Sequence, residues 1–128
     1  MRREAERLQD ILDAIVAIER YASLGRQAFD EQELIQVWVI HHLQIIGEAA
    51  SSLSGDLMNR YSEVPWAQIV AFRNVVVHEY FRVSLSLVWA IVQNNLPPLK
   101  ATVEKMLQEL GEARGDNAGV KGEVGGEV

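Results

Sequence analysis

Apolar side chains recur every three or four residues along most of this 128-residue chain, and this period constrains the fold more than any other feature. It is clear from Leu8 to Ala22, where charged residues occupy the other side of the helical wheel. Such a period is that of an amphipathic α-helix that buries one face. No pair of segments alternates as two paired strands would. The pattern predicts an all-α protein, an antiparallel four-to-five-helix bundle with one core.

Glycine, proline and short polar side chains mark the expected helix ends. The first helix should end near Gly25, and a second should run over about 31–53 after a start signal at Asp30. A third is expected to open at Pro65, which suits a first helical position, and a fourth at Ser84, a good N-cap. Pro97 and its neighbours should end or kink that helix before a last one.

The middle of the second helix, residues 37–47, is apolar on nearly every side. One packed neighbour cannot cover a helix all round, so this segment should be buried on two faces. In so small a protein we expect the second face to meet another copy of the chain, which predicts a homodimer. Gly47 is costly inside a helix and fits a close backbone approach there.

Composition limits the class of protein. We expect one helical domain over 1–110 and a Gly-rich, disordered tail over 111–128. The chain has no cysteine, which excludes disulfides, thiolate metal sites and cysteine nucleophiles. A net charge of -6 argues against a general nucleic-acid coat, so any RNA contact must be local. No signal peptide or membrane-spanning stretch is evident, so a cytoplasmic protein without membrane contact is expected.

The segment 73–80 is one that ordinary fold maintenance does not explain. Arg73 supplies a forked cation suited to phosphate, His78 can exchange a proton near neutral pH, and Tyr80 offers a nucleophilic phenol. Together they suggest phosphate chemistry. The alternative is structural: His78 caps a helix end, Arg73 extends from the core surface to water, and Tyr80 is a core aromatic.

Helical geometry alone does not bring this group together. At about 100° per residue, Arg73 and Tyr80 share one side of a helix, whereas His78 lies about 140° away from Arg73. Either the helix loosens near His78, or the arginine curls round, or the second subunit of a dimer completes the site. We favour loosening and a second subunit together.

His41 and His42 also invite a metal site, but adjacent helical positions point about 100° apart and no carboxylate stands at ligand spacing. We therefore predict no metal, and expect both histidines to be interface or partly exposed side chains.

The pattern Arg73-x4-His78-x-Tyr80 resembles the signature of the HEPN superfamily, and specifically that of its HepT-like toxins. A lone Arg-x4-His would be a weak signal, but several further blocks resemble that family in the same order. They are Asp10-Ile11-Leu12, Ile18-Glu19-Arg20-Tyr21, Ile45-Ile46-Gly47-Glu48-Ala49-Ala50, Val64-Pro65-Trp66, Val88-Trp89 and Asn95-Leu96-Pro97.

The resemblance implies the toxin of a HepT/MntA type toxin–antitoxin system, a homodimer that cleaves RNA without a metal or other cofactor. Arg73 and His78 would be the catalytic residues, contributed by both subunits, and Asn74 would orient the substrate. The chemistry suits them. A ribose 2′-OH acting as internal nucleophile needs a proton acceptor, a proton donor and positive charge on the phosphate.

Tyr80 has a separate implied role. In HepT-like systems the antitoxin, an MntA-like nucleotidyltransferase, silences the toxin by attaching AMP to the motif tyrosine. AMPylation of Tyr80 would add a phosphodiester anion beside Arg73, where substrate phosphate would bind, and its bulk would obstruct the cleft.

The sequence departs from the family pattern at His41-His42-Leu43-Gln44, where these proteins often carry an arginine, an asparagine and a glutamate around the leucine. Those side chains commonly face the groove, which puts substrate preference in doubt. A second function therefore stays open, that of a non-catalytic helical nucleotide-binding or interaction module that is only the acceptor of modification. The negative charge favours this module, and the pairing of Arg73 with His78 favours the nuclease.

Overall fold

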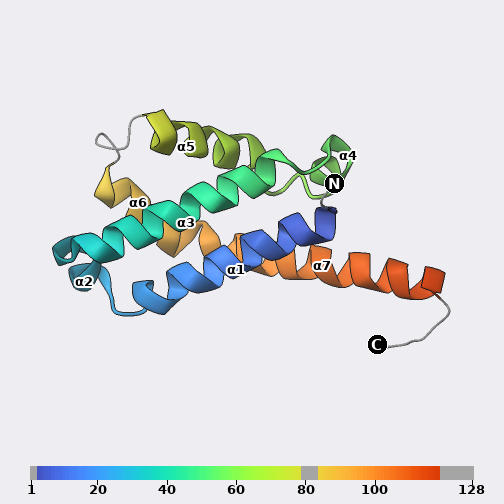
Figure 1. Cartoon of the computed structure of the whole chain (residues 1–128), viewed down its shortest axis with the longest axis horizontal. Coiled ribbons are helices and arrows are strands. Elements are labelled where there is room, and N and C mark those ends of the chain that lie inside the picture. The colour runs from blue at the N-terminus through green and yellow to red at the C-terminus, as the bar shows by residue number, and fades with distance from the viewer. Residues whose placement is uncertain (1–2, 79–83, 119–128) are drawn as a thin grey trace.

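The computed structural model describes residues 3–78 and 84–118, with side chains described for 3–73 and 84–111. The described residues form seven α-helices and no strand, which confirms the all-α prediction (Figure 1). They are α1 (Glu4–Ala22), α2 (Arg26–Glu31), α3 (Glu33–Ser51), α4 (Gly55–Arg60), α5 (Trp66–His78), α6 (Leu85–Asn94) and α7 (Leu96–Ala118). The five longer helices are those of the predicted bundle.

Helix α3 is the central element of the bundle. Helix α1 packs along one side of it and α5 along another, each antiparallel to α3 (Figure 1). Helix α7 packs on α1 and α6, so it closes the bundle on the side away from α5. The all-round apolarity of α3 thus has an explanation within one chain, because α5 covers the second face that we expected a second copy to cover.

Apolar side chains from all seven helices form the core. Helix α5 contributes only its first residue, Trp66, among its described side chains. Among the described residues, no polar or charged side chain is fully buried. The largest fully buried side chains are Phe29, Leu8, Ile11, Ile15, Ile18, Leu57, Met106, Val39, Val88 and Val103. Their three-to-four spacing along α1 is the pattern that predicted the helix.

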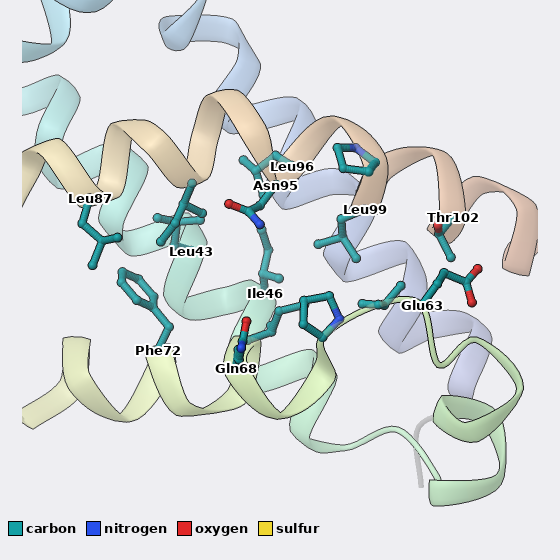
Figure 2. A pocket seen from close by; sticks show the side chains of 15 residues that line it. Leu43, Ile46, Glu63, Gln68, Phe72, Leu87, Asn95, Leu96, Leu99 and Thr102 are labelled. Atoms are coloured by element: carbon teal, nitrogen blue, oxygen red, sulfur yellow. The ribbon is translucent and has the colours of Figure 1, made fainter.

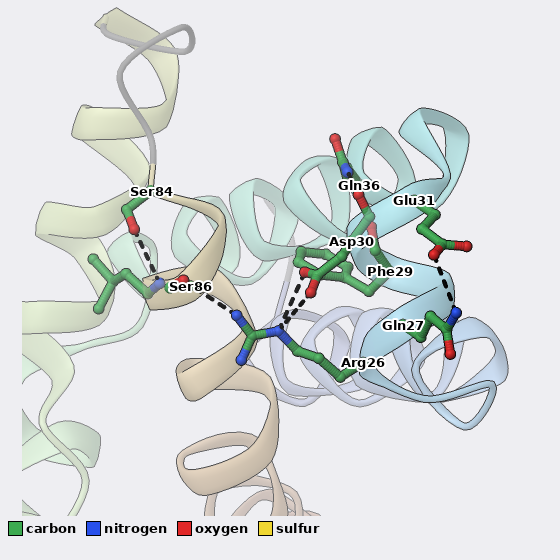
Figure 3. Close-up of polar contacts among 9 residues, drawn as sticks. Arg26, Gln27, Phe29, Asp30, Glu31, Gln36, Ser84 and Ser86 are labelled. Atoms are coloured by element: carbon green, nitrogen blue, oxygen red, sulfur yellow. Dashed lines mark hydrogen bonds and ion pairs between the residues drawn. The ribbon is translucent and has the colours of Figure 1, made fainter.

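The first helix ends near Gly25 as predicted, but the start of the next differs from its prediction. Helix α1 ends at Ala22, and Gly25, with φ of 100°, is the N-cap of α2, a short helix that we did not expect. Asp30 does not cap α3. It lies in α2 and accepts two hydrogen bonds from Arg26 Nε (3.1 and 3.2 Å), while the extended Gln32 separates the helices. Gln36 Nε2 then donates to the carbonyl oxygens of Phe29 and Asp30 at the end of α2 (Figure 3).

Helix α2 also fastens the start of α6. Arg26 Nη2 donates to Ser86 Oγ (3.2 Å; Figure 3). The Phe29 ring lies 5.2 Å from that of Trp89. Ser84 is the predicted N-cap, since its Oγ accepts the Leu87 N–H. The chain that follows the motif is therefore anchored where α6 begins.

Two further ties join sequence-distant helices. Lys100 Nζ on α7 donates to the Glu19 carboxylate on α1 (3.0 Å), which raises the pKa of Lys100 above its ordinary value. Ser54, the N-cap of α4, donates its backbone N–H to Glu4 at the start of α1 (2.6 Å). The segment between α3 and Pro65 thus contains a capped helical turn.

The last helix extends beyond its expected end. Helix α7 passes Gly111 and continues to Ala118, into the segment predicted as a disordered tail, and 119–128 lie outside the described residues. Helix α6 stops at Asn94, as Pro97 and Pro98 predict, and both prolines fall in the first turn of α7. No helix among the described residues is long and apolar enough to cross a membrane.

Candidate active site

Helix α5 carries the motif and is anchored at its first residues. Pro65 directly precedes it, and the Pro65 carbonyl accepts the N–H groups of Gln68 and Ile69 (both 3.1 Å). The Trp66 indole is buried, and its Nε1 donates to the Tyr61 carbonyl oxygen (3.1 Å). One end of α5 is therefore fixed to the bundle, and the motif lies toward the other end.

Arg73 lies where α5 crosses α3. Its Nη1 is 2.8 Å from Glu48 Oε1, and the two side chains are 28% and 54% exposed. Its Nε is buried and has no hydrogen-bond partner among the described residues. The guanidinium is thus partly withdrawn from water, with one end held by a carboxylate of α3.

The Arg73 stem lies directly on the backbone of α3. A Cβ atom built on Gly47 would be 2.4 Å from Arg73 Cβ and 3.2 Å from the Ile69 carbonyl oxygen. Gly47 therefore serves the close approach that its place inside a helix predicts, and this approach is to α5 of the same chain. The sequence pointed to Gly47 but gave no role to Glu48, although both lie in one of the blocks that resemble the family.

The structure places the other motif residues only in part. Asn74 and His78 belong to α5, whose described part ends at His78, and their side chains are not described. Because the helix is continuous from Arg73 to His78, the separation of about 140° around its axis stands, and α5 shows no loosening before His78. Tyr80 lies outside the described residues.

His41 and His42 are neighbours on α3. His42 Nδ1 donates to the Trp38 carbonyl oxygen (2.7 Å), and its ring lies 4.4 Å from the Trp38 ring, so His42 is a half-buried packing residue. His41 is exposed. In the part of the chain that the structure describes, no three His, Asp or Glu side chains gather as metal ligands would.

A groove of about 570 Å³ runs along another side of α5, between it and α6 and α7 (Figure 2). Apolar side chains such as Phe72, Leu43 and Leu99 line most of it, and Arg73 is not among the lining residues. Among the described lining residues, the one charged side chain is that of the acidic Glu63. These described side chains offer no cation for RNA phosphates, which distinguishes the groove from the candidate site at Arg73.

Comparison with known proteins supports the family resemblance. The family model described as "Ribonuclease HepT-like" matches residues 11–106, about three quarters of the chain. "Putative RNase MJ1380" of Methanocaldococcus jannaschii is 36% identical over 98 residues, which cover 76% of this chain and 90% of that protein. "Probable ribonuclease HepT" of Thermococcus cleftensis is 33% identical over 100 residues, covering 77% of this chain and 91% of that protein.

A third relative is longer. "Gamma-glutamylcyclotransferase and putative RNase MJ0434" of Methanocaldococcus jannaschii is 33% identical over 104 residues, so the chain spans about half of it (47%). No solved structure matches the chain. The match over most of the helical bundle, together with two relatives covered almost end to end, places this chain in the ribonuclease HepT-like family.

Proposed function

We propose that this protein is a metal-independent RNA endonuclease, the toxin of a toxin–antitoxin pair, with Arg73 and His78 as catalytic residues. The observation that carries the proposal is the environment of Arg73. This cation belongs to α5, the helix that also contains His78, and its side chain is held against α3 by Gly47 and Glu48. The two relatives named as ribonucleases support it.

The proposed reaction needs no cofactor. One His78 takes the proton of a ribose 2′-OH, the oxygen attacks the adjacent phosphorus, and the bond to the 5′-oxygen breaks as that oxygen receives a proton. Arg73 stabilises the charge that develops on the non-bridging oxygens. Asn74, the next residue on α5, would orient the substrate. The products are a 2′,3′-cyclic phosphate and a 5′-hydroxyl.

We further propose that the site lies at the cleft of a homodimer. Each chain has one motif histidine, and one imidazole cannot easily serve as base and acid in the same step. Helix α5 supports this idea, since Ile69, Val70 and Phe72 are apolar but only half-buried in one chain. A second copy packed near α5 would cover such side chains and bring a second His78.

Regulation is proposed at Tyr80. An MntA-like nucleotidyltransferase antitoxin would transfer AMP from ATP to the phenol with release of pyrophosphate, and the added anion would occupy Arg73 and exclude RNA. RNA and ATP are both available in the cytoplasm, which is where we propose that the pair acts.

The alternative, a non-catalytic nucleotide-binding or interaction module, has one observation in its favour. Glu48 pairs with Arg73 and offsets its charge, in a chain whose net charge is already -6. Such a protein would bind its antitoxin and accept AMP at Tyr80 without cleaving RNA.

Cleavage of bulk cellular RNA by the purified protein in excess EDTA separates the two functions. We expect wild type to cleave, and His78→Ala and Arg73→Ala to lose activity by about a hundredfold or more, as the removal of proton transfer or phosphate stabilisation predicts. The Ala variants also control for contaminating ribonuclease. Folded wild type that binds its antitoxin but cleaves no RNA would support the interaction module.

A further inference from the structure

We infer that Glu48 is a positioning residue that holds the Arg73 guanidinium in the orientation needed for phosphate, an inference that rests on the proposed function. Glu48 lies on α3, 25 residues from Arg73 in sequence, and the ion pair joins the two helices. Its Oε1 accepts a hydrogen bond from Nη1 (2.8 Å), and no hydrogen bond among the described residues joins Nη2 to that carboxylate.

The Arg73 stem is confined before Glu48 acts on its end. Because Gly47 has no side chain, Arg73 Cβ and Cγ occupy the space that a Cβ at position 47 would take, at 2.4 and 3.0 Å from it. This packing limits where the stem can lie. The remaining freedom is rotation of the guanidinium, and the charge-assisted hydrogen bond from Nη1 to Glu48 restricts that rotation.

The two edges of the guanidinium are not equivalent. Nε is buried without a partner among the described residues, so the Nε side faces protein and not solvent. Phosphate oxygens bound in a forked geometry must then use the Nη1–Nη2 end. Glu48 takes one of the N–H groups at this end and fixes the plane in which the others are presented.

The carboxylate has two opposing effects on an RNA substrate. Its charge offsets that of Arg73, which weakens the attraction of phosphate, while its hydrogen bond orients the guanidinium for the transition state. Removing the charge should therefore lower KM, while the loss of orientation lowers kcat. Substitution of a residue that only stabilised the fold would lower the fraction of protein that is folded and active, and would leave KM unchanged.

Steady-state cleavage of a defined RNA oligonucleotide tests this expectation with Glu48→Gln, which keeps the shape of the side chain and removes its charge. We expect kcat to fall about five- to tenfold, the effect of one charge-assisted bond in a partly exposed pair, together with a lower KM. Glu48→Asp, with a shorter carboxylate, should retain part of the lost rate. Glu19→Gln is the matched control, since it breaks the comparable ion pair with Lys100 away from Arg73, and its kinetics should equal wild type.

An unchanged or increased kcat in Glu48→Gln would overturn the inference and make Glu48 a brake on Arg73. A second readout does not depend on activity. In protein with isotope-labelled arginine, NMR should show slow rotation about the Arg73 Nε–Cζ bond in wild type and faster rotation in Glu48→Ala, with Arg73→Lys identifying the signal. Equal rotation would also overturn the inference. Slow rotation in a wild type that cleaves no RNA would instead show that Glu48 holds the guanidinium and that the nuclease proposal is wrong.

Discussion

At the scale of single residues, Arg73 is held at both ends of its side chain. Gly47 receives the stem and Glu48 binds the guanidinium. Both contacts come from α3, so the candidate site belongs to two helices and not to the motif alone. An ordinary surface arginine that reached from the core into water would need neither contact.

Modification of Tyr80 is the prediction that belongs to this scale. Incubation with ATP and the cognate nucleotidyltransferase should add the mass of AMP to Tyr80, because its phenol occupies the motif position. Peptide mass spectrometry locates the adduct, and nuclease activity should disappear as it accumulates.

The two other tyrosines provide controls. Tyr61 is buried and hydrogen-bonded to Glu109, and Tyr21 packs edge-on against Trp38. Tyr21→Phe should still be modified and Tyr80→Phe should not. An adduct that persists in Tyr80→Phe would contradict the assignment.

The residues of the site were predictable from sequence to different degrees. Arg73 and His78 stand at a fixed spacing within one segment, so a local pattern exposes them. No local pattern reveals Glu48, because its contact with Arg73 depends on how α3 and α5 lie against each other. Gly47 is intermediate, since its cost inside a helix signals a close approach without naming the partner.

At the scale of elements, the long helices form where their apolar residues predict them, and the errors concern short elements and the end of α7. Helices α2 and α4 have six residues each, too few for a period to show. The acidic start signal at Asp30 was wrong because Arg26, within the same short helix, binds that carboxylate. For α3, sequence showed that two faces are covered but could not say that α5 covers the second.

Gly47→Ala tests the contact between α3 and α5. Overpacking costs about 1 to 3 kcal/mol, and the better helix propensity of alanine returns about 1, so we expect a net loss of up to about 2 kcal/mol in the free energy of unfolding. Nuclease activity should fall further than stability alone explains, because a shift of α5 moves Arg73. Chemical denaturation and the cleavage assay measure the two effects.

Gly111→Ala is the matched control within α7. A Cβ atom at Gly111 meets nothing within 4 Å, so this substitution should stabilise the protein by about 0.5 to 1 kcal/mol and leave cleavage unchanged. Equal stabilisation by both substitutions would mean that α5 does not press on Gly47.

At the scale of the whole molecule, the described surface retains apolar side chains that one chain does not cover. Leu34 is 84% exposed and Val37 40% exposed, and both lie in the first half of α3. Helices α3 and α5 run antiparallel, and Gly47 lies against Arg73, so residues that precede Gly47 lie toward the His78 end of α5. An interface over Leu34 and Val37 would therefore bring a second chain toward the motif.

We predict that wild type is a dimer and that Leu34→Glu with Val37→Glu makes it a monomer. Each substitution acts twice across a two-fold interface, so the dissociation constant should rise roughly a hundredfold or more. Sedimentation equilibrium measures it, and circular dichroism checks that the helices remain. Leu24→Glu, at a side chain 59% exposed in the turn after α1, should stay dimeric. An active wild-type monomer would contradict the composite site.

The central claim is that Arg73 and His78 direct a ribose 2′-OH against its own phosphate, and the most direct measurement is the chemistry of the product ends. An RNA oligonucleotide cleaved in excess EDTA should yield a 2′,3′-cyclic phosphate and a 5′-hydroxyl, and a single 2′-deoxy substitution at the cleaved position should abolish cleavage there. Two results would contradict this mechanism by showing a different nucleophile. One is cleavage of the deoxy substrate at the substituted position. The other is the formation of 5′-phosphate ends by wild type but not by His78→Ala.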